Sequence, residues 1–218
     1  MLKLVIGDRN YSSWSLRPWL AIKQAKLPFE EIFIRLRETG TKAAIFKYSP
    51  SGKVPCLIDG DTVVWESLAI CEYLAESEPS LWPADRRARA EARSVCAEMH
   101  SGFGALRQNL PMQISASKPY EERNAEVKAD LARIVKIWES CRARFAAGGP
   151  FLFGADMGAA DVKYAPVVTR LLTWAPEIGA ATRAYCDAMR AHRLMDEWYR
   201  AAAAEPADMT QEEYEVLA

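Results

Sequence analysis

Histidine and paired cysteine are scarce in this sequence. The only two histidines, His100 and His192, are far apart in the chain, and none of the five cysteines forms a C-x-x-C pair. Two distant imidazoles argue against a metal site, and an odd number of spread cysteines argues against a disulfide framework. Because Cys71, Cys96 and Cys141 fall at apolar positions of helix-like segments, we expect them to be small core hydrophobes and expect no bound metal.

Long hydrophobic runs and an excess of one charge are also absent. No apolar run approaches the roughly 20 residues of a membrane helix, and residues 1–8 lack the features of a signal peptide. The 28 basic and 29 acidic side chains nearly cancel, so no basic surface is predicted for nucleic acid or an anionic membrane. With 50% hydrophobic and 26% charged residues, the composition favours a soluble cytoplasmic protein.

The character of the chain changes near residue 80. Before it, short strand-like and helix-like segments alternate, whereas after it strand signals nearly vanish. A chain of 218 residues is long enough for one large domain or two small ones. We predict an N-terminal domain at 1–78, a proline-containing linker at 79–85 and an all-helical domain at 86–218.

The first part has the order β-α-β-α-β-β-α. Strands are expected at 2–6, 29–36, 55–58 and 62–64, and helices at 15–25, 41–47 and 67–76. The first helix should have Ser15 as its N-cap and Pro18 in its first turn. A strand-helix-strand unit implies parallel pairing, while Asp59-Gly60 between apolar runs indicates an antiparallel hairpin. One mixed four-stranded α/β sheet satisfies both.

The second part shows helical periodicity. One apolar face runs through about 86–112, and further helices are expected near 127–145, 160–174, 176–189 and 193–204. The pair Gly148-Gly149 should terminate the helix near 127–145. The acidic segment 205–218 is expected to be a loose tail.

A cluster of hydroxyl groups lies between the first strand and the first helix. It consists of Ser12, Ser13 and Ser15, around Trp14. Hydroxyl groups and the N-terminal end of a helix both favour a bound anion, and ligands gather at the carboxyl ends of strands in such sheets. No G-x-S-x-G motif occurs, so a hydroxyl that donates to a ligand thiolate fits better than a serine nucleophile. Simple helix capping is the alternative.

Two further segments carry candidate binding groups. Lys53-Val54-Pro55 precedes a strand, where a cis proline and the outward N–H and C=O of Val54 could pair with a peptide. Glu66-Ser67 begins a helix, where Ser67 could bind a carboxylate and Glu66 an ammonium group. The alternatives are a strand that starts with proline and ordinary helix capping. Taken together, the three segments predict a ligand with an amino-acid end, a strand-like middle and a thiol, as in glutathione.

In combination and order, these motifs resemble the cytosolic glutathione transferases over nearly the whole chain. The matching runs are Ser-Ser-Trp-Ser-Leu-Arg at 12–17, Ser-Pro-Ser-Gly-Lys-Val-Pro at 49–55 and Glu-Ser-Leu-Ala-Ile at 66–70. The resemblance implies a thioredoxin-like domain followed by a helical domain. Hydroxyls stand where thioredoxin carries a C-x-x-C pair, which argues against dithiol redox chemistry.

The resemblance also implies roles for individual residues. The first run is closest to the zeta class, whose first motif serine is catalytic, so Ser12 ranks first and Ser13 second. Val54 with cis Pro55 would pair with the cysteinyl part of glutathione as co-substrate, and Glu66 with Ser67 would hold its γ-glutamyl end. Lys53 would meet the glycyl carboxylate or a peptide carbonyl, and a solvated lysine without a ligand contact is the alternative. The family is usually dimeric, which implies a homodimer.

An electrophilic small molecule is the implied second substrate. Its pocket is expected between Ser12 and the first helix of the second domain, lined by Tyr11, Trp14, Phe103, Arg107 and Met112. Arg107 could neutralise an acidic substrate, with a surface ion pair as the alternative, whereas Phe103 could equally serve core packing. The zeta class carries cysteine where this chain has Trp14, which narrows or reshapes the pocket.

The reaction class remains open at this point. The expected activity is glutathione conjugation in detoxification, with isomerase, peroxidase or dehalogenase activity, or a binding module with little catalysis, as alternatives. The family's Ser/Thr-x-x-Asp capping box is matched at Asp161, with Gly158 in place of the hydroxyl residue. Glycine is a tolerable N-cap, since it costs only about a few tenths of a kcal/mol relative to serine.

Overall fold

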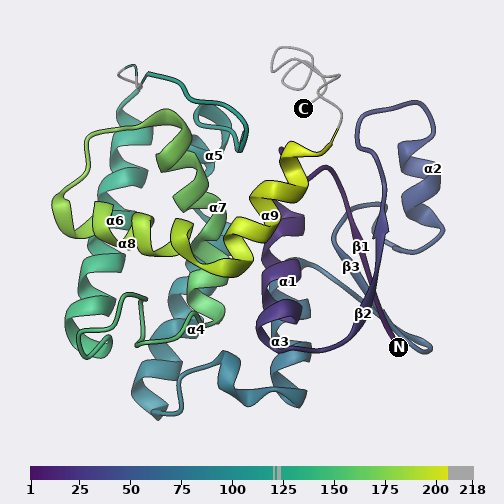
Figure 1. Cartoon of the computed structure of the whole chain (residues 1–218), viewed down its shortest axis with the longest axis horizontal. Helices are drawn as coiled ribbons and strands as arrows, with labels where there is room; N and C mark the ends of the chain where they lie inside the picture. The colour runs from purple at the N-terminus through teal and green to yellow at the C-terminus, as the bar shows by residue number, and fades with distance from the viewer. Residues whose placement is uncertain (120, 122–123, 206–218) are drawn as a thin grey trace.

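The N-terminal part contains a mixed four-stranded sheet. The computed structural model describes residues 1–119, 121 and 124–205, so most of the expected acidic tail lies outside the described residues. The strands are β1 (Leu2–Ile6), β2 (Phe29–Phe33), β3 (Cys56–Asp59) and β4 (Thr62–Trp65), in the spatial order β2-β1-β3-β4. β1 and β2 are parallel and the other pairs are antiparallel, which confirms the predicted topology (Figure 1).

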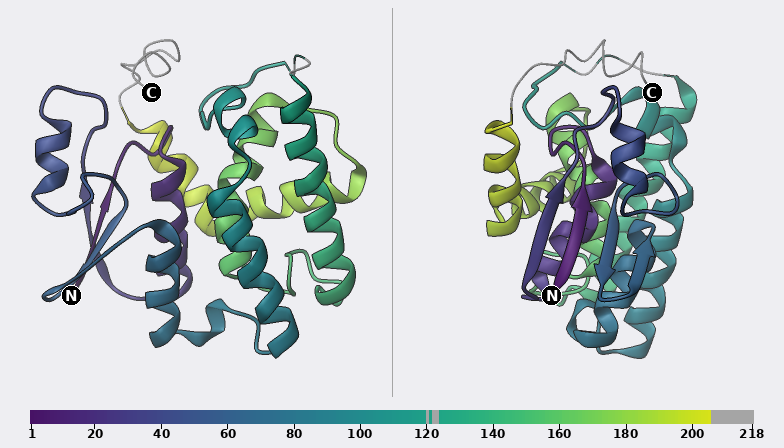
Figure 2. Two further views of the ribbon diagram at one scale, coloured as in Figure 1. Left: turned by 180° about the vertical axis from the view of Figure 1, so that it is seen from behind. Right: turned by 90° about the vertical axis from the view of Figure 1, so that its right-hand side faces the viewer.

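Alternate side chains of β1 pack on opposite faces of the sheet. Leu4 and Ile6 belong to the main core together with residues of α1 (Ser13–Gln24) and α3 (Ser67–Ser77). Val5 points to the other face, as the two-residue period of a strand requires, and packs with Ile45 of α2 (Thr41–Phe46). Figure 2 shows α2 on the opposite side of the sheet from α1 and α3.

The first helix starts earlier than the sequence predicts. Ser12, and not Ser15, is its N-cap, because the Ser12 Oγ accepts a hydrogen bond from the Ser15 N–H at 3.3 Å. Ser15 Oγ instead accepts from the N–H of Gly7 at 3.0 Å and so ties the helix to the end of β1. Pro18 consequently lies beyond the first turn.

The expected second strand is also shorter than predicted. It ends at Phe33 rather than at Leu36. The chain then turns away from the sheet, and the N–H of Leu36 donates to the Asp8 carboxylate at 2.7 Å.

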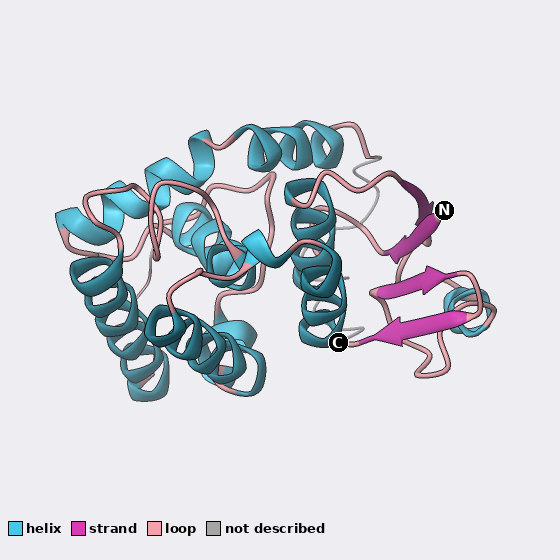
Figure 3. Ribbon diagram, turned by 90° about the horizontal axis from the view of Figure 1, so that it is seen from below, coloured by secondary structure: helices cyan, strands magenta, loops and turns pink. Residues whose placement is uncertain are grey.

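Helices dominate the remainder of the described chain. A short 3-10 turn, η1 (Pro79–Leu81), precedes them. Figure 3 shows the strands gathered at one end of the molecule and most helices at the other. The helices are α4 (Arg86–Ser101), α5 (Gly104–Asn109), α6 (Ala125–Phe145), α7 (Ala159–Trp174), α8 (Ala180–Ala191) and α9 (Arg193–Ala203). Within the described residues, no helix is long and apolar enough to span a membrane.

The predicted continuous helix at about 86–112 is wrong, because the structure has two helices there. The chain breaks at Gly102 and at Phe103, whose φ of 56° lies in the left-handed region. A Cβ at Gly102 would approach the Glu98 carbonyl oxygen to 2.8 Å, so the absence of a side chain permits this break. Met99 and Leu106 are both buried, which is why the apolar periodicity continues across it.

The helix expected at 176–189 begins later, at Ala180. α7 ends at Ala175 in the left-handed conformation, and Gly179 is the N-cap of α8. The intervening residues therefore form a loop and not a first helical turn.

Helix α7 connects the two parts of the molecule. Every residue of α7 except Leu172 is buried, and the helix packs against α1, α4 and α8. At its start, the Asp161 carboxylate accepts hydrogen bonds from the N–H groups of Gly158 and Leu152, both at 2.9 Å. A Cβ at Gly158 would lie 3.2 Å from the Leu81 carbonyl oxygen, which accounts for glycine at this N-cap. This anchoring places the first turns of α7 against α1.

Candidate functional site

The N-terminal end of α1 carries the serine cluster. Ser12 and Ser13 are buried, and Ser12 Oγ donates to Ser15 Oγ at 2.8 Å. The backbone N–H of Trp14 forms no hydrogen bond within the described residues, and neither does the Ser13 hydroxyl. Free N–H groups at a helix start attract anions, so this end of α1 can hold a negatively charged group.

A cavity of about 190 Å³ opens beside this helix end. Its walls come from α1, the segment before β3, the start of α3 and α4. The lining residues are Trp14, Ser51, Lys53, Val54, Pro55, Glu66 and His100. Each of the three sequence motifs therefore contributes at least one residue to the cavity, whereas Ser12, Ser13 and Ser67 are buried and do not line it.

The segment before β3 forms one wall. The Val54–Pro55 peptide bond is cis, in agreement with the sequence prediction. Within the described residues, the backbone N–H and C=O of Val54 have no hydrogen-bond partner, because pairing with the neighbouring strands starts at Cys56. An extended peptide in the cavity could form these bonds. Lys53 is exposed at the rim.

The start of α3 forms the opposite wall. Glu66 has φ 71° and ψ 124°, a backbone conformation that is strained for a residue with a side chain. Its carboxylate lies 3.6 Å from Nε2 of His100. Ser67 is the first residue of α3 and is fully buried, and its Oγ accepts a hydrogen bond from Nζ of Lys163 at 2.8 Å. The pair thus places a carboxylate at the cavity and a buried hydroxyl at the adjacent position.

Positive charge collects behind the Trp14 ring. The Arg17 guanidinium lies 4.5 Å from the ring centroid, the Arg107 guanidinium 5.5 Å and the Lys163 ammonium 5.8 Å. Arg17 Nε donates to the Lys163 carbonyl oxygen at 3.0 Å, whereas its Nη2 is buried without a partner in the described structure. No carboxylate lies within salt-bridge distance of Arg17 or Lys163 among the described residues.

Burial lowers the pKa values of the basic groups near Trp14. It lowers the pKa of Arg17 to about 9, with repulsion from Arg170 and Arg107 adding to the effect. Burial, and then repulsion from Arg17, lowers the pKa of Lys163 to about 8. Burial and the nearby Lys163 ammonium also lower the pKa of His100. At neutral pH the groups behind Trp14 therefore stay cationic, while the His100 imidazole at the cavity is neutral, and this distribution of charge favours an anionic ligand.

The residues predicted for the electrophile pocket are only partly together. Trp14 lines the cavity, and Arg107 lies against its ring. Phe103 and Met112 are buried in the main core, which agrees with the packing alternative for Phe103. Tyr11 is half-buried just before Ser12, and its N–H donates to the Asp8 carbonyl at 3.3 Å.

Three residues at the site were not singled out from the sequence. His100 and Ser51 line the cavity, and Lys163 supports Ser67 from α7. A lysine inside the apolar run Ala159–Val168 was a signal for Lys163, because a buried lysine needs a special environment. Ser51 belongs to the matching run at 49–55 but was given no role of its own, and no comparable local signal marked His100.

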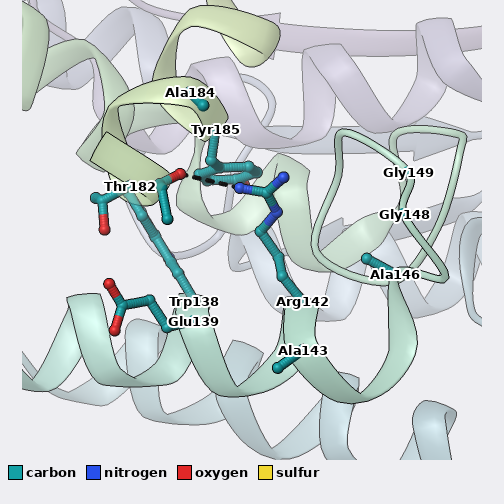
Figure 4. A pocket seen from close by; sticks show the side chains of 11 residues that line it. Trp138, Glu139, Arg142, Ala143, Ala146, Gly148, Gly149, Thr182, Ala184 and Tyr185 are labelled. Atoms are coloured by element: carbon teal, nitrogen blue, oxygen red, sulfur yellow. Dashed lines mark hydrogen bonds between the residues drawn. The ribbon is translucent and has the colours of Figure 1, made fainter. Parts of the chain in front are cut away.

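A second cavity, of about 350 Å³, lies between α6 and α8 (Figure 4). Trp138, Arg142 and Tyr185 form much of its wall, and Arg142 Nη1 donates to the Ala181 carbonyl at 3.0 Å. None of the predicted site residues lines it. We therefore place the candidate site at the smaller cavity.

Comparisons with known proteins agree with the geometry. Residues 11–77 match the family model for the N-terminal domain of glutathione S-transferase, and residues 121–201 match that for its C-terminal domain. The Glutathione S-transferase GstB of Escherichia coli K12 is 28% identical over 79% of this chain and 87% of that protein. The maleylacetoacetate isomerase of Mus musculus is 31% identical over 73% of each chain.

A solved structure has the same fold. It is a glutathione transferase homolog from Burkholderia gl BGR1 with bound glutathione, which superposes with a TM-score of 0.71 at 21% identity over 94% of this chain and 99% of that chain. The two family matches, the identity to the curated relatives and the shared fold agree with one another. The chain therefore belongs to the cytosolic glutathione S-transferase superfamily.

Proposed function

We propose that this chain is a glutathione transferase that binds glutathione at the cavity beside α1 and transfers it to an electrophilic small molecule. The observation that carries the proposal is that Trp14, the Lys53–Pro55 segment and Glu66 meet at one cavity. They belong to the helix end, the peptide-pairing segment and the polar pair that a tripeptide thiol requires.

Glutathione is expected to lie across the cavity with each part at a matching wall. The unpaired backbone of Val54 forms hydrogen bonds with the cysteinyl unit, as an added strand does. Glu66 attracts the γ-glutamyl ammonium, and Ser67 donates to the adjacent carboxylate. Lys53 at the rim pairs with the glycyl carboxylate.

The thiol is activated at the start of α1. A free thiol has a pKa of about 8.5, so little thiolate exists at neutral pH. A hydrogen bond from Ser12 and the unpaired N–H of Trp14 stabilise the thiolate and lower that pKa. The thiol proton leaves to water, and the sulfur electron pair then forms a carbon–sulfur bond to the electrophile, with a leaving group departing where one is present.

Two alternatives are separated by assay. A relative named maleylacetoacetate isomerase supports a glutathione-dependent isomerase, in which glutathione is regenerated and not consumed. A glutathione-binding module with little catalysis would bind the peptide without lowering its thiol pKa. Peroxidase and dehalogenase activity belong to the same thiolate chemistry.

We also propose a cytoplasmic homodimer acting in detoxification. The side chains of Phe46 and Trp65 are 52% and 44% exposed. Large exposed apolar side chains of this kind support association with a second copy of the chain. Sedimentation of the full chain should give twice the mass of 24.4 kDa.

The test of the proposed function is direct. The full chain is titrated with glutathione by calorimetry and then assayed with aryl halides, epoxides, organic peroxides and cis-unsaturated diacids. Binding with consumption of glutathione and formation of a thioether supports a transferase. Conversion of a diacid without consumption supports the isomerase, and no binding of glutathione contradicts the proposal.

A further inference from the structure

Lys163 occupies an unusual position for a lysine. It lies in the second turn of α7, its side chain is fully buried, and no carboxylate among the described residues forms an ion pair with it. A buried ammonium without a counter-ion is costly, because water no longer solvates it. An anionic group of a bound ligand would offset that cost.

The first contact of Lys163 leads to the expected carboxylate site. Its Nζ donates to Ser67 Oγ at 2.8 Å. Since the oxygen of Ser67 accepts this hydrogen bond from the protein interior, the hydroxyl hydrogen is free to point elsewhere. Ser67 begins α3, so unpaired backbone N–H groups lie beside that hydroxyl. The ammonium thereby strengthens a hydrogen-bond donor at a helix end.

The second contact leads to the expected ammonium site. Nζ of Lys163 lies 3.4 Å from Nδ1 of His100, and Nε2 of the same ring lies 3.6 Å from the Glu66 carboxylate. An ammonium can only donate, so Nδ1 is the acceptor and Nε2 carries the hydrogen. The Nε2 hydrogen then faces the Glu66 carboxylate across 3.6 Å, beyond hydrogen-bond distance. Of Ser67 and Glu66, only Ser67 therefore accepts a hydrogen bond directly from the buried cation.

Resting on the proposed function, we infer that Lys163 is a positioning residue that selects the α-carboxylate of the γ-glutamyl unit. It acts on that carboxylate through its hydrogen bond to Ser67. Arg17 adds to the same field, because its guanidinium is also buried without a carboxylate among the described residues and bonds to the Lys163 carbonyl. The cavity is therefore matched to a ligand end that carries both a carboxylate and an ammonium group.

The experiment compares three thiol peptides by calorimetry. Glutathione carries both groups, 4-aminobutanoyl-cysteinylglycine lacks only the α-carboxylate, and 4-carboxybutanoyl-cysteinylglycine lacks only the amine. Each is titrated into wild type, Lys163→Met, Lys163→Arg and the control Thr169→Val. Thr169 is a matched control, since it is buried on the same helix and donates only to the Pro166 carbonyl of its own helix.

The expected result is selective. Lys163→Met should weaken glutathione about tenfold, because a charge-supported hydrogen bond is lost, and should leave the peptide without the α-carboxylate nearly unchanged. Lys163→Arg should restore much of the glutathione affinity. Thr169→Val should match wild type with all three peptides. Thermal unfolding of each variant checks that it is folded.

Two outcomes would overturn the inference. Equal weakening of glutathione and the decarboxylated peptide by Lys163→Met would show that Lys163 only supports the fold. Equal affinity of wild type for glutathione and for the peptide without the α-carboxylate would show that the protein does not recognise that carboxylate. If wild type binds no glutathione, the proposed function itself fails, whereas a loss of selectivity confined to the variants bears on Lys163 alone.

Discussion

Ser12 Oγ and Ser15 Oγ are joined by a hydrogen bond of 2.8 Å at the start of α1. The Ser12 hydroxyl donates to Ser15 Oγ, which also accepts from the N–H of Gly7. Hydroxyl hydrogens rotate to suit their partners, so Ser15 can donate to Ser12 when Ser12 turns its own hydrogen to a thiolate. Ser15 thus both binds the loop backbone at Gly7 and positions the hydroxyl of Ser12.

Replacing Ser15 should therefore lower stability. In Ser15→Ala, the buried N–H of Gly7 loses its acceptor, which should reduce the free energy of unfolding by about 1–3 kcal/mol. Urea denaturation measures the change. Ser94→Ala is the control, because that exposed hydroxyl bonds only to its own helix, and it should change stability by less than about 0.5 kcal/mol. Equal effects of the two substitutions would contradict this role of Ser15.

Ser12→Ala should lower turnover far more than glutathione affinity. Loss of a hydrogen bond to a charged sulfur costs about 1.5–3 kcal/mol, or about 10- to 150-fold in kcat. Ser13→Ala is the matched comparison and should lose less, since Ser12 ranks first. Steady-state kinetics with a reactive aryl halide separates kcat from KM. A larger loss in Ser13→Ala would reverse the ranking, and the free hydroxyl of Ser13 would then be the donor.

Changes at the start of α3 should act on binding instead. Ser67→Ala and Glu66→Ala should each raise the KM for glutathione about tenfold while kcat changes little, because neither group is expected to touch the sulfur. Ser80→Ala is a control in which an exposed hydroxyl bonded to Glu78 is removed. Ser67→Ala and Glu66→Ala should both elute early from immobilised glutathione, whereas Ser80→Ala should be retained like wild type. Unchanged retention would remove the assignment of the amino-acid end.

The buried Lys163 predicts a pH dependence of stability. Burial lowers its pKa from 10.5 to about 8, so between these values the unfolded chain binds more protons than the folded one. Stability should then rise with pH across this window, relative to Lys163→Met, by an amount on the order of 3 kcal/mol. Its neighbours Arg17, His100, Glu66 and Cys71 are common to both proteins, which makes the difference informative. A constant difference between pH 7 and pH 10.5 would contradict the prediction.

The sheet could be predicted because its rules are local. The Asp59-Gly60 turn fixes an antiparallel hairpin, and the first strand-helix-strand unit fixes a parallel pair, so the mixed sheet follows. The break at Gly102 could not be predicted, because the apolar period continues from α4 into α5 through the same core. The first helix cap was misplaced because Ser12 and Ser15 are both plausible caps in sequence.

The site was only partly accessible from the sequence for a related reason. Ser12, Val54 and Glu66 belong to motifs with recognisable local context. Val54 and Glu66 line one cavity together with Trp14, which follows Ser12 at the start of α1. Lys163 reaches Ser67 only because α7 packs against α1 across the two parts of the molecule. His100 joins them from α4. Contacts between residues so distant in the chain leave no local pattern.

The most direct test of the account is the thiol pKa of bound glutathione, measured by ultraviolet absorbance of the thiolate. Wild type should bring it below the free value of about 8.5 by one unit or more, since one charge-assisted hydrogen bond supplies the required ~1.4 kcal/mol. In Ser12→Ala the value should return toward that of the free peptide. A bound thiol in wild type that titrates like free glutathione would contradict thiolate stabilisation at the start of α1.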